Sequence, residues 1–392
     1  MHWMVHKGNT VALTQEELAA VTKITCISSD VASVLGSTPA LAILEICDGR
    51  LPDSLGQFTT KLAKLAFRRC RELEAFSVHL TMLTALYIID CRVTMLPESV
   101  SRLVALKTLH IKNCLQLKVL PESVGLLANL RTLDVTECGL TTLPQSVGQL
   151  AMLSTLHLSY CACLAELPES LGQLAALTTL VFDGCCQLTR LPNSLGELKL
   201  LATTHFVGCR ALIEATLGRL TAVTMLDFGS CSALRRLPNE LGSMTALKTL
   251  CLYFCVSLTE LPESLGQLTA LTTLNLVGCR RLTMLPESLG QLPLLTTLKL
   301  SRCTDLICLP LSFVYLPDCC FAPWHGLIAL TFPPSGFVSE NGDIKQFLLA
   351  HHGLLKSLVL ILAARRNNMP HVPDELWVGL EDESKHEDLS SY

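Results

Sequence analysis

Residues 261–282 read LPESLGQLTALTTLNLVGCRRL and contain a turn pattern followed along the chain by a strand pattern. Leu274 and Leu276 alternate with other residues at the two-residue period of a short strand with one buried face. The leucines before them have the three-residue spacing of a helical or 3₁₀ turn: Leu265, Leu268 and Leu271. Pro262 is tolerated where such a turn begins, and Glu263 suits the positive end of its dipole. One strand and one turn per unit are therefore predicted.

The same unit recurs at a fixed period. Leu-Pro pairs are separated by 23 or 24 residues, apart from one double interval of 46. They begin at Leu96, Leu120, Leu143, Leu167, Leu191, Leu237, Leu261, Leu285 and Leu309. The double interval contains a degenerate unit, with Leu217-Gly218 in place and Ile213-Glu214 where Leu-Pro should be. Because one unit cannot bury its own apolar face, the units must stack.

Counting the strand pattern along the chain gives the strand of each unit. Clear strands are centred on Leu65, Leu86, Leu109, Leu133, Leu156, Leu180, Thr204, Leu226, Leu250, Leu274 and Leu298. Two weaker strands precede them, at Ile24 with Cys26 and at Leu44 with Ile46, and a further candidate follows at Leu327-x-x-Leu330-x-Phe332. The prediction is an α/β fold: a curved solenoid of about thirteen coils from residue 15 to residue 316, with a parallel sheet on its concave face.

The units resemble the leucine-rich repeats of intracellular plant disease-resistance proteins and of the related Ras-group leucine-rich repeat proteins. Three phrases carry the resemblance: Leu261-Pro-Glu-Ser-Leu-Gly-Gln-Leu, Leu271-Thr-Thr-Leu-Asn-Leu-Val-Gly-Cys279 and Leu282-Thr-Met-Leu-Pro286. It covers residues 51–316 and implies a leucine-rich repeat horseshoe. It also implies a non-catalytic scaffold or sensor in signalling or defence, although these families hold different partners. The Gly-x-x-x-x-Gly-Lys-[Ser/Thr] motif of a nucleotide switch is absent from the sequence.

Eleven of the nineteen cysteines share one position, three residues after the second strand leucine. They are Cys70, Cys91, Cys114, Cys138, Cys161, Cys185, Cys209, Cys231, Cys255, Cys279 and Cys303. In leucine-rich repeats this position faces the interior and bonds to loop backbone, so the resemblance implies a structural ladder. A metal or redox ladder is the alternative, but a single column gives each thiol only two neighbours. Reduced, buried thiols are expected.

The residues between the two strand leucines should point outward from the concave sheet. Coil by coil these are Ala66, Tyr87, His110, Asp134, His157, Val181, His205, Asp227, Cys251, Asn275 and Lys299. The predicted partner-binding residues, taken from this column and from the positions just after the strands, are Tyr87, His110, Asp134, His157, Tyr160, Asp183, His205, Asp227, Tyr253, Phe254, Lys299 and Arg302. Basic residues such as Arg68, Arg69 and Arg302 lie toward its ends. Because aromatic side chains amid polar groups are favoured at protein interfaces, a protein partner is predicted on this face.

His110, Asp134 and His157 occupy the same register on three successive strands, which raises the alternative of a zinc or other divalent-cation site. Strands about 4.8 Å apart offer a straight row of ligands without tetrahedral closure. Neither a metal site nor a cofactor is therefore predicted.

Composition and charge argue against several classes of protein. The 30 basic and 34 acidic residues give a net charge of −4, without the basic footprint of a nucleic-acid-binding protein. The apolar stretch Leu358–Ala364 is far shorter than the roughly 20 residues of a membrane helix. Met1–Thr10 contains no apolar signal-peptide region, and the sequence has no Asn-x-Ser/Thr sequon. A cytoplasmic monomer that binds neither nucleic acid nor membrane is expected.

The ends of the chain differ from the repeats. Residues 1–50 are predicted to form an N-terminal cap with degenerate repeats, including a capping box at Thr14-Gln-Glu-Glu17. Residues 317–370 are predicted to form a C-terminal cap, and residues 371–392 an acidic tail.

Two alternative functions involve the C-terminal region. Val372-Pro-Asp-Glu-Leu-Trp377 is similar to the phrase that opens an F-box, which would suit the substrate adaptor of a ubiquitin ligase. An enzyme could instead place its site there, with groups drawn from His325, His351, His352 and Cys320. No nucleophile and base stand in a recognised spacing, so a binding module without catalysis is preferred.

Overall fold

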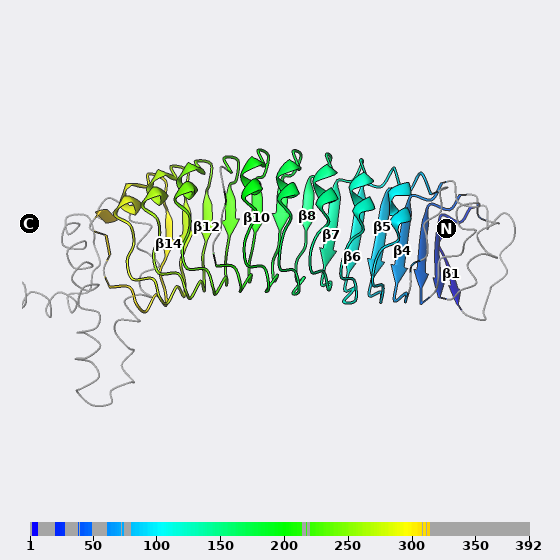
Figure 1. The fold of residues 1–392 in the computed structure, drawn as a ribbon, viewed down its shortest axis with the longest axis horizontal. Coiled ribbons are helices and arrows are strands. Elements are labelled where there is room, and N and C mark those ends of the chain that lie inside the picture. The colour runs from blue at the N-terminus through cyan, green and yellow to red at the C-terminus, as the bar shows by residue number, and fades with distance from the viewer. Residues whose placement is uncertain are drawn as a thin grey trace, which may run out of the picture.

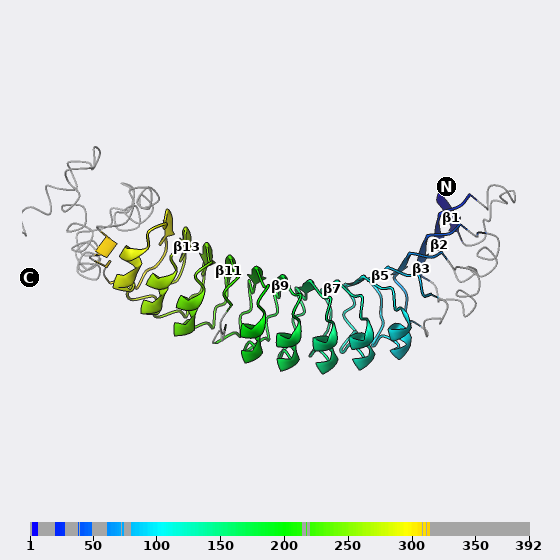
Figure 2. The same cartoon turned by 90° about the horizontal axis from the view of Figure 1, so that it is seen from above.

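The computed structural model describes residues 2–6, 20–27, 38, 40–48, 61–71, 73, 80–213, 217, 220–307, 309, 310, 312 and 313. Within them, fourteen parallel strands form one sheet, and each strand pairs with its neighbours in sequence (Figure 1). The strands lie on the inner side of an arc and the turns on its outer side (Figure 2). The predicted solenoid and parallel concave sheet are confirmed.

Strand bounds follow the predicted pattern closely. The five-residue strands are β1 (His2–His6), β2 (Lys23–Ile27), β3 (Ile43–Cys47), β4 (Lys64–Arg68), β5 (Ala85–Ile89), β6 (Thr108–Lys112) and β7 (Thr132–Thr136). The three-residue strands are β8 (Thr155–His157), β9 (Thr179–Val181), β10 (Thr203–His205), β11 (Met225–Asp227), β12 (Thr249–Cys251), β13 (Thr273–Asn275) and β14 (Thr297–Lys299). The predicted strand centres from Ile24 to Leu298 pair in a single register.

The solenoid begins earlier than predicted. Strand β1 pairs in parallel with β2, placing Trp3 beside Ile24, so a start at residue 15 is wrong. His2–His6 lacks the spaced leucines of the other units, which is why the repeat pattern does not reveal it. The expected capping box, the candidate coil at 327–332, and the cap and tail from residue 317 onward lie outside the described residues.

The predicted helical turns are 3₁₀ helices of five residues. They are η1 (Glu98–Arg102), η2 (Glu122–Leu126), η3 (Gln145–Gln149), η4 (Glu169–Gln173), η5 (Asn193–Glu197), η6 (Asn239–Ser243), η7 (Glu263–Gln267) and η8 (Glu287–Gln291). Each follows a proline, whose fixed φ and missing N–H suit the start of a helical turn. A proline followed three residues later by a buried Leu or Val, repeated in all eight of these turns, thus accounts for the regular outer side of the arc.

Neighbouring turns are joined by a contact between coils. The carboxylate of Glu169 accepts hydrogen bonds from the backbone N–H groups of Asn193 and Ser194 in the next coil, at 3.2 and 3.0 Å. Glu263 makes the same contact with the N–H of Ser288 at 3.3 Å. The glutamate of one coil therefore caps the turn of the next coil, and not only its own turn as the sequence suggested.

Each coil with a ladder cysteine leaves its strand through a residue in the left-handed backbone region, directly before that cysteine, and Asp48 has the same conformation one coil earlier. Positive φ values occur at Asp48, Arg69, Asp90, Asn113, Glu137, Tyr160, Gly184, Gly208, Ser230, Phe254, Gly278 and Arg302. Because this conformation turns the chain sharply, it fixes the side chain at this position on the rim of the concave face.

One continuous apolar core fills the coils. Leu65, Leu109 and Leu274, like the other strand leucines, are 0% exposed. The strand leucine is replaced by Thr204 in the degenerate region, where it is also 0% exposed. The rings of Phe182, Phe206 and Phe228 stack there, with centroids 5.9 and 5.2 Å apart. Only residues from coils on both sides can bury these leucines, so stacking is what stabilises the fold.

Candidate protein-binding surface on the concave face

The outward positions of adjacent strands form three parallel rows on the concave face. The middle row contains Thr25, Glu45, Ala66, Tyr87, His110, Asp134, His157, Val181, His205, Asp227, Cys251, Asn275 and Lys299, aligned by strand register. Because the sheet is parallel and in register, chemically different side chains are held side by side in a fixed order. This arrangement gives the chain a long surface whose composition changes from coil to coil.

The predicted binding residues differ in how much of their surface is accessible. Tyr160, Phe254, Lys299 and Arg302 are exposed. Tyr87, His110, Asp134, His157, Asp183, His205 and Tyr253 are half-buried. Asp227 is only 8% exposed, so its side chain offers little surface to a partner.

Tyr87, His110, Asp134 and His157 form a contiguous group. Asp134 Oδ2 lies 3.0 Å from His110 Nδ1, and its Oδ1 lies 3.7 Å from His157 Nδ1. The ring of Tyr87 lies beside that of His110, with centroids 5.9 Å apart. The carboxylate thus bonds to His110 and lies near His157, whose Nε2 is within hydrogen-bond distance of Ser159 Oγ at 2.7 Å. In the part of the chain that the structure describes, no group of three His, Cys, Asp or Glu could hold a metal ion.

The acidic side chains further along turn back toward the backbone. Asp183 Oδ1 accepts a hydrogen bond from the N–H of Val207 at 2.9 Å, and Asp227 Oδ1 accepts one from the N–H of Gly229 at 2.7 Å. Burial raises the pKa of Asp227, and the hydrogen bond from Gly229 opposes that shift. These carboxylates therefore support the strand ends as well as contributing charge to the face.

The aromatic side chains use glycines of neighbouring coils as flat contact surfaces. A Cβ added at Gly184 would lie 2.6 Å from Cδ1 of Tyr160, so the tyrosine ring occupies that space. The rings of Tyr253 and Phe254 occupy the corresponding space at Gly229 and Gly278. Tyr160 nevertheless remains 63% exposed and Phe254 38% exposed. Among the four aromatic residues predicted to bind the partner, these two have the largest exposed fractions.

The ladder cysteines lie behind this face, in the interior. All eleven are at most 8% exposed and free of disulfides. Each donates from Sγ to the carbonyl of the residue at the second strand-leucine position of the preceding coil, as Cys255 does to Phe228 at 3.1 Å and Cys279 to Leu252 at 3.1 Å. Burial raises the pKa of Cys161 to about 11. The ladder thus joins each coil to the one before it. Its buried thiols stay protonated and are therefore unreactive.

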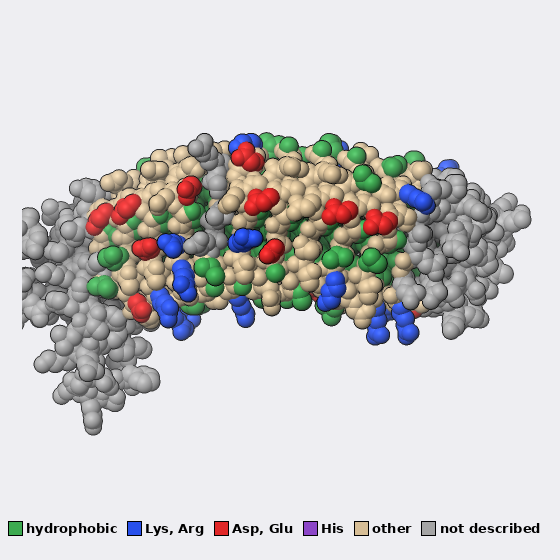
Figure 3. Space-filling model, viewed as in Figure 1, with side chains coloured by type: hydrophobic (Ala, Val, Ile, Leu, Met, Phe, Trp, Pro, Cys, Tyr) green, Lys and Arg blue, Asp and Glu red, His purple; other side chains and the backbone are tan. Residues whose placement is uncertain are grey.

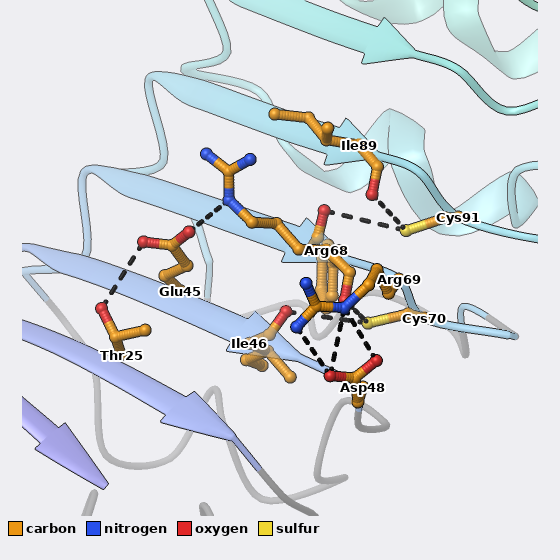
Figure 4. A network of polar contacts seen from close by, with 10 residues as sticks. Thr25, Glu45, Ile46, Asp48, Arg68, Arg69, Cys70, Ile89 and Cys91 are labelled. Atoms are coloured by element: carbon orange, nitrogen blue, oxygen red, sulfur yellow. Dashed lines mark hydrogen bonds and ion pairs between the residues drawn. The ribbon is translucent and has the colours of Figure 1, made fainter. Parts of the chain in front are cut away.

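A hollow at the N-terminal end of the face was not predicted from the sequence. A depression of about 190 Å³ is lined by Lys23, Ile43, Leu44, Glu45, Lys64, Ala66, Arg68, Tyr87 and Ile89. Figure 4 shows Arg68 Nε donating to Glu45, whose other oxygen accepts from Thr25. Arg69 forms a separate exposed pair with Asp48 at 2.8 Å. In the sequence, only the short Ala66 between the long basic side chains of Lys64 and Arg68 indicated this hollow. No known motif has this pattern.

Other basic residues gather outside the face. Figure 3 shows Lys and Arg along the lower edge, where the strands of Figure 1 end, and acidic side chains spread across the surface above. The exposed arginines in loops that follow strands include Arg210, Arg235, Arg280 and Arg281. Basic and acidic side chains therefore occupy different positions within the coils. The net charge of −4 does not reveal this arrangement.

The residues invoked for the F-box-like adaptor and for an enzyme lie outside the described residues. Across the residues that are described, no helix is long and apolar enough to cross a membrane.

Comparisons with known proteins follow the same repeats. Residues 120–232 match a family described as a leucine-rich repeat region, and residues 219–374 match the leucine-rich repeats described as disease resistance protein RPS4B-like. No curated protein matches the chain.

Several solved structures are similar in fold. A leucine-rich repeat protein of Leptospira interrogans is 22% identical over 79% of this chain and 91% of its own, with a TM-score of 0.44. An internalin of Listeria monocytogenes is 17% identical over 76% and 88%, with a TM-score of 0.48. A plant peptide hormone receptor, in complex with RGF2, is 17% identical over 81% of this chain and 63% of its own, with a TM-score of 0.43.

Proposed function

The chain is a leucine-rich repeat protein, and we propose that it is a non-catalytic scaffold or sensor that binds a protein partner on its concave face. One observation carries the proposal: a uniform buried frame presents a row of outward side chains that differ from coil to coil. Such a row can encode recognition without altering the fold.

The size of the surface favours a macromolecule. The hollow near Ala66 has a volume of about 190 Å³, below the roughly 300–1,000 Å³ of sites for small molecules and cofactors. The sheet, in contrast, extends through fourteen strands. A protein partner could contact Tyr87, Tyr160 and Phe254 together, whereas a small molecule could contact one of them.

The proposal also includes the cellular location, the kind of pathway and the oligomeric state of the protein. Free ladder thiols support a reducing, cytoplasmic location. The match of residues 219–374 to disease-resistance repeats supports a role in signalling or defence. We expect a monomer, since binding on the concave face needs no second copy.

The test is affinity capture from a lysate of the source organism with two variants of matched size. One carries Tyr87→Ala, Tyr160→Ala and Phe254→Ala; the other carries Leu126→Ala, Leu200→Ala and Met284→Ala, which lie in turns and loops between strands. The proposal requires a partner that the first variant loses and the second retains, with similar thermal unfolding of both. Identical partner sets for the two variants would refute it.

A further inference from the structure

The hollow on the concave face arises from one short side chain. Ala66 is in the middle of β4, with Glu45 and Tyr87 at the same register on β3 and β5. Lys64 and Arg68 precede and follow it by two residues on the same strand, and so point to the same face. Longer side chains thus surround a methyl group on four sides, and Ile43 and Ile89 close two corners.

The walls of the hollow carry an excess of positive charge. Lys23, Lys64 and Arg68 face one carboxylate, that of Glu45. Among the described residues, neither lysine forms an ion pair. Arg68 bonds to Glu45 through Nε alone, and Figure 4 shows its two terminal nitrogens directed away from that carboxylate. A guanidinium has five N–H donors in a fixed fork, so the terminal nitrogens remain available to a second carboxylate.

The floor and two corners of the hollow are apolar. Ala66, Ile43 and Ile89 supply aliphatic surface, and Tyr87 adds a ring. The volume of about 190 Å³ slightly exceeds the roughly 150 Å³ cavity that can hold benzene. The space therefore fits a single apolar side chain, with positive groups around it for a neighbouring negative charge.

We propose that this hollow binds an acidic segment of the protein partner, in which an Asp or Glu stands beside an apolar residue. The apolar side chain lies on Ala66 between Ile43 and Ile89, and the carboxylate binds Lys64 and the free nitrogens of Arg68. The proposal rests on the proposed function and specifies the chemistry of the partner.

The occupant is an internal segment of the partner and not a chain end. On one side of the hollow the same row continues through Tyr87 and His110, and on the other through Glu45 and Thr25. A bound peptide can therefore extend along the face in both directions. Glu45 opposes a second negative charge on the β3 side, which directs the acidic residue toward Lys64 and Arg68.

Peptide display provides the test. The full-length protein is panned against random linear peptides displayed without a free C-terminus, and the affinity of the best enriched peptide is measured by fluorescence anisotropy. The filling variant is Ala66→Trp, and its matched control is Val181→Trp, in the same row on β9. The charge variant is Lys64→Glu, and its control is Lys248→Glu, at an exposed lysine directly before β12 and far from the hollow.

Enriched peptides should pair an acidic with an apolar residue, and Ala66→Trp and Lys64→Glu should each weaken binding at least about tenfold. Both controls should bind like the parent, and affinity should fall as salt rises. Failure to enrich any peptide, enrichment without acidic residues, or equal binding by Ala66→Trp and Val181→Trp would overturn the proposal.

A further variant separates this proposal from the proposed function. Tyr160→Ala with Phe254→Ala alters the concave face far from the hollow. A peptide lost with this variant and retained by Ala66→Trp would place recognition on the face but outside the hollow. A peptide unaffected by any concave substitution would overturn both proposals.

Discussion

The carboxylate of Glu122 accepts a hydrogen bond from the backbone N–H of Ser146 in the following coil, at 3.0 Å. The same contact recurs from Glu169 to Ser194 and from Glu287 to Ser312. The outer side of the arc is thus joined by charged acceptors at helical-turn N-termini, while the inner side is joined by the sheet. Hydrogen bonds between adjacent coils on both sides explain how repeats of about 24 residues form one stable solenoid.

These glutamates predict a loss of stability in acid. The hydrogen bond from the backbone of Ser194 lowers the pKa of Glu169 below its usual 4.5, so the stabilisation is present above that value and is lost as pH falls through the folded-state pKa. Glu169→Gln should destabilise the protein at neutral pH by less than about 1 kcal/mol, because the site is largely exposed. Its unfolding free energy should fall less than that of the parent between about pH 5 and pH 3.

Urea unfolding at each pH measures this effect. Glu197→Gln is the control, since among the described residues the one ion-pair contact of that carboxylate is with Lys199 at 3.8 Å. Parallel pH curves for the parent and Glu169→Gln would contradict the capping role.

A buried hydroxyl predicts a stabilising substitution. Thr204 is 0% exposed, and its Oγ1 has no hydrogen-bond partner. Thr204→Val keeps the shape and removes the unpaired polar atom, so it should stabilise the protein by about 1 kcal/mol. Chemical denaturation should show this gain for Thr204→Val and little change for Thr203→Val, whose side chain is half-buried. A destabilised Thr204→Val protein would show that the hydroxyl is satisfied.

Two glycines with the same backbone conformation should respond differently to alanine. Gly184 and Gly208 have φ values of 70° and 74°, so both substitutions should cost about 1 kcal/mol in backbone strain. Only Gly184→Ala also displaces Tyr160, since the nearest atoms to a Cβ at Gly208 are 3.8 Å away. The additional cost at Gly184 should disappear when Tyr160 is also replaced by alanine. Additive free energies in this double-mutant cycle would mean that the ring does not depend on Gly184.

The cysteine ladder should resist labelling until the protein unfolds. The exposed Cys163 is expected to react promptly with a thiol reagent, whereas the buried ladder thiols, such as Cys185, should react only on denaturation. We also predict that Cys319 and Cys320 react before the ladder. Time-resolved mass spectrometry of the native protein reads out each site. Native labelling of the ladder at the rate of Cys163, or ladder disulfides in fresh protein, would contradict this prediction.

The repeat period was sufficient to predict the strand register and the buried cysteine column, because both depend on residues inside one unit. Contacts between units were harder to foresee. Glu263 was expected to act on its own turn, yet its carboxylate reaches Ser288 in the next coil. Asp227 was expected to face a partner, but it bonds within its own coil to Gly229, which the ring of Tyr253 from the next coil covers. Such details depend on the neighbouring coil, whose placement the sequence pattern leaves open.

The central claim is that partners bind the concave and not the convex side. Tyr160 on the concave rim and Leu126 in η2 are each 63% exposed, which makes them a matched pair for a photo-crosslinking amino acid. Illumination in a lysate of the source organism should join a discrete partner to the protein labelled at Tyr160 and none to the protein labelled at Leu126. A partner joined at Leu126, with none at Tyr160, would contradict the account.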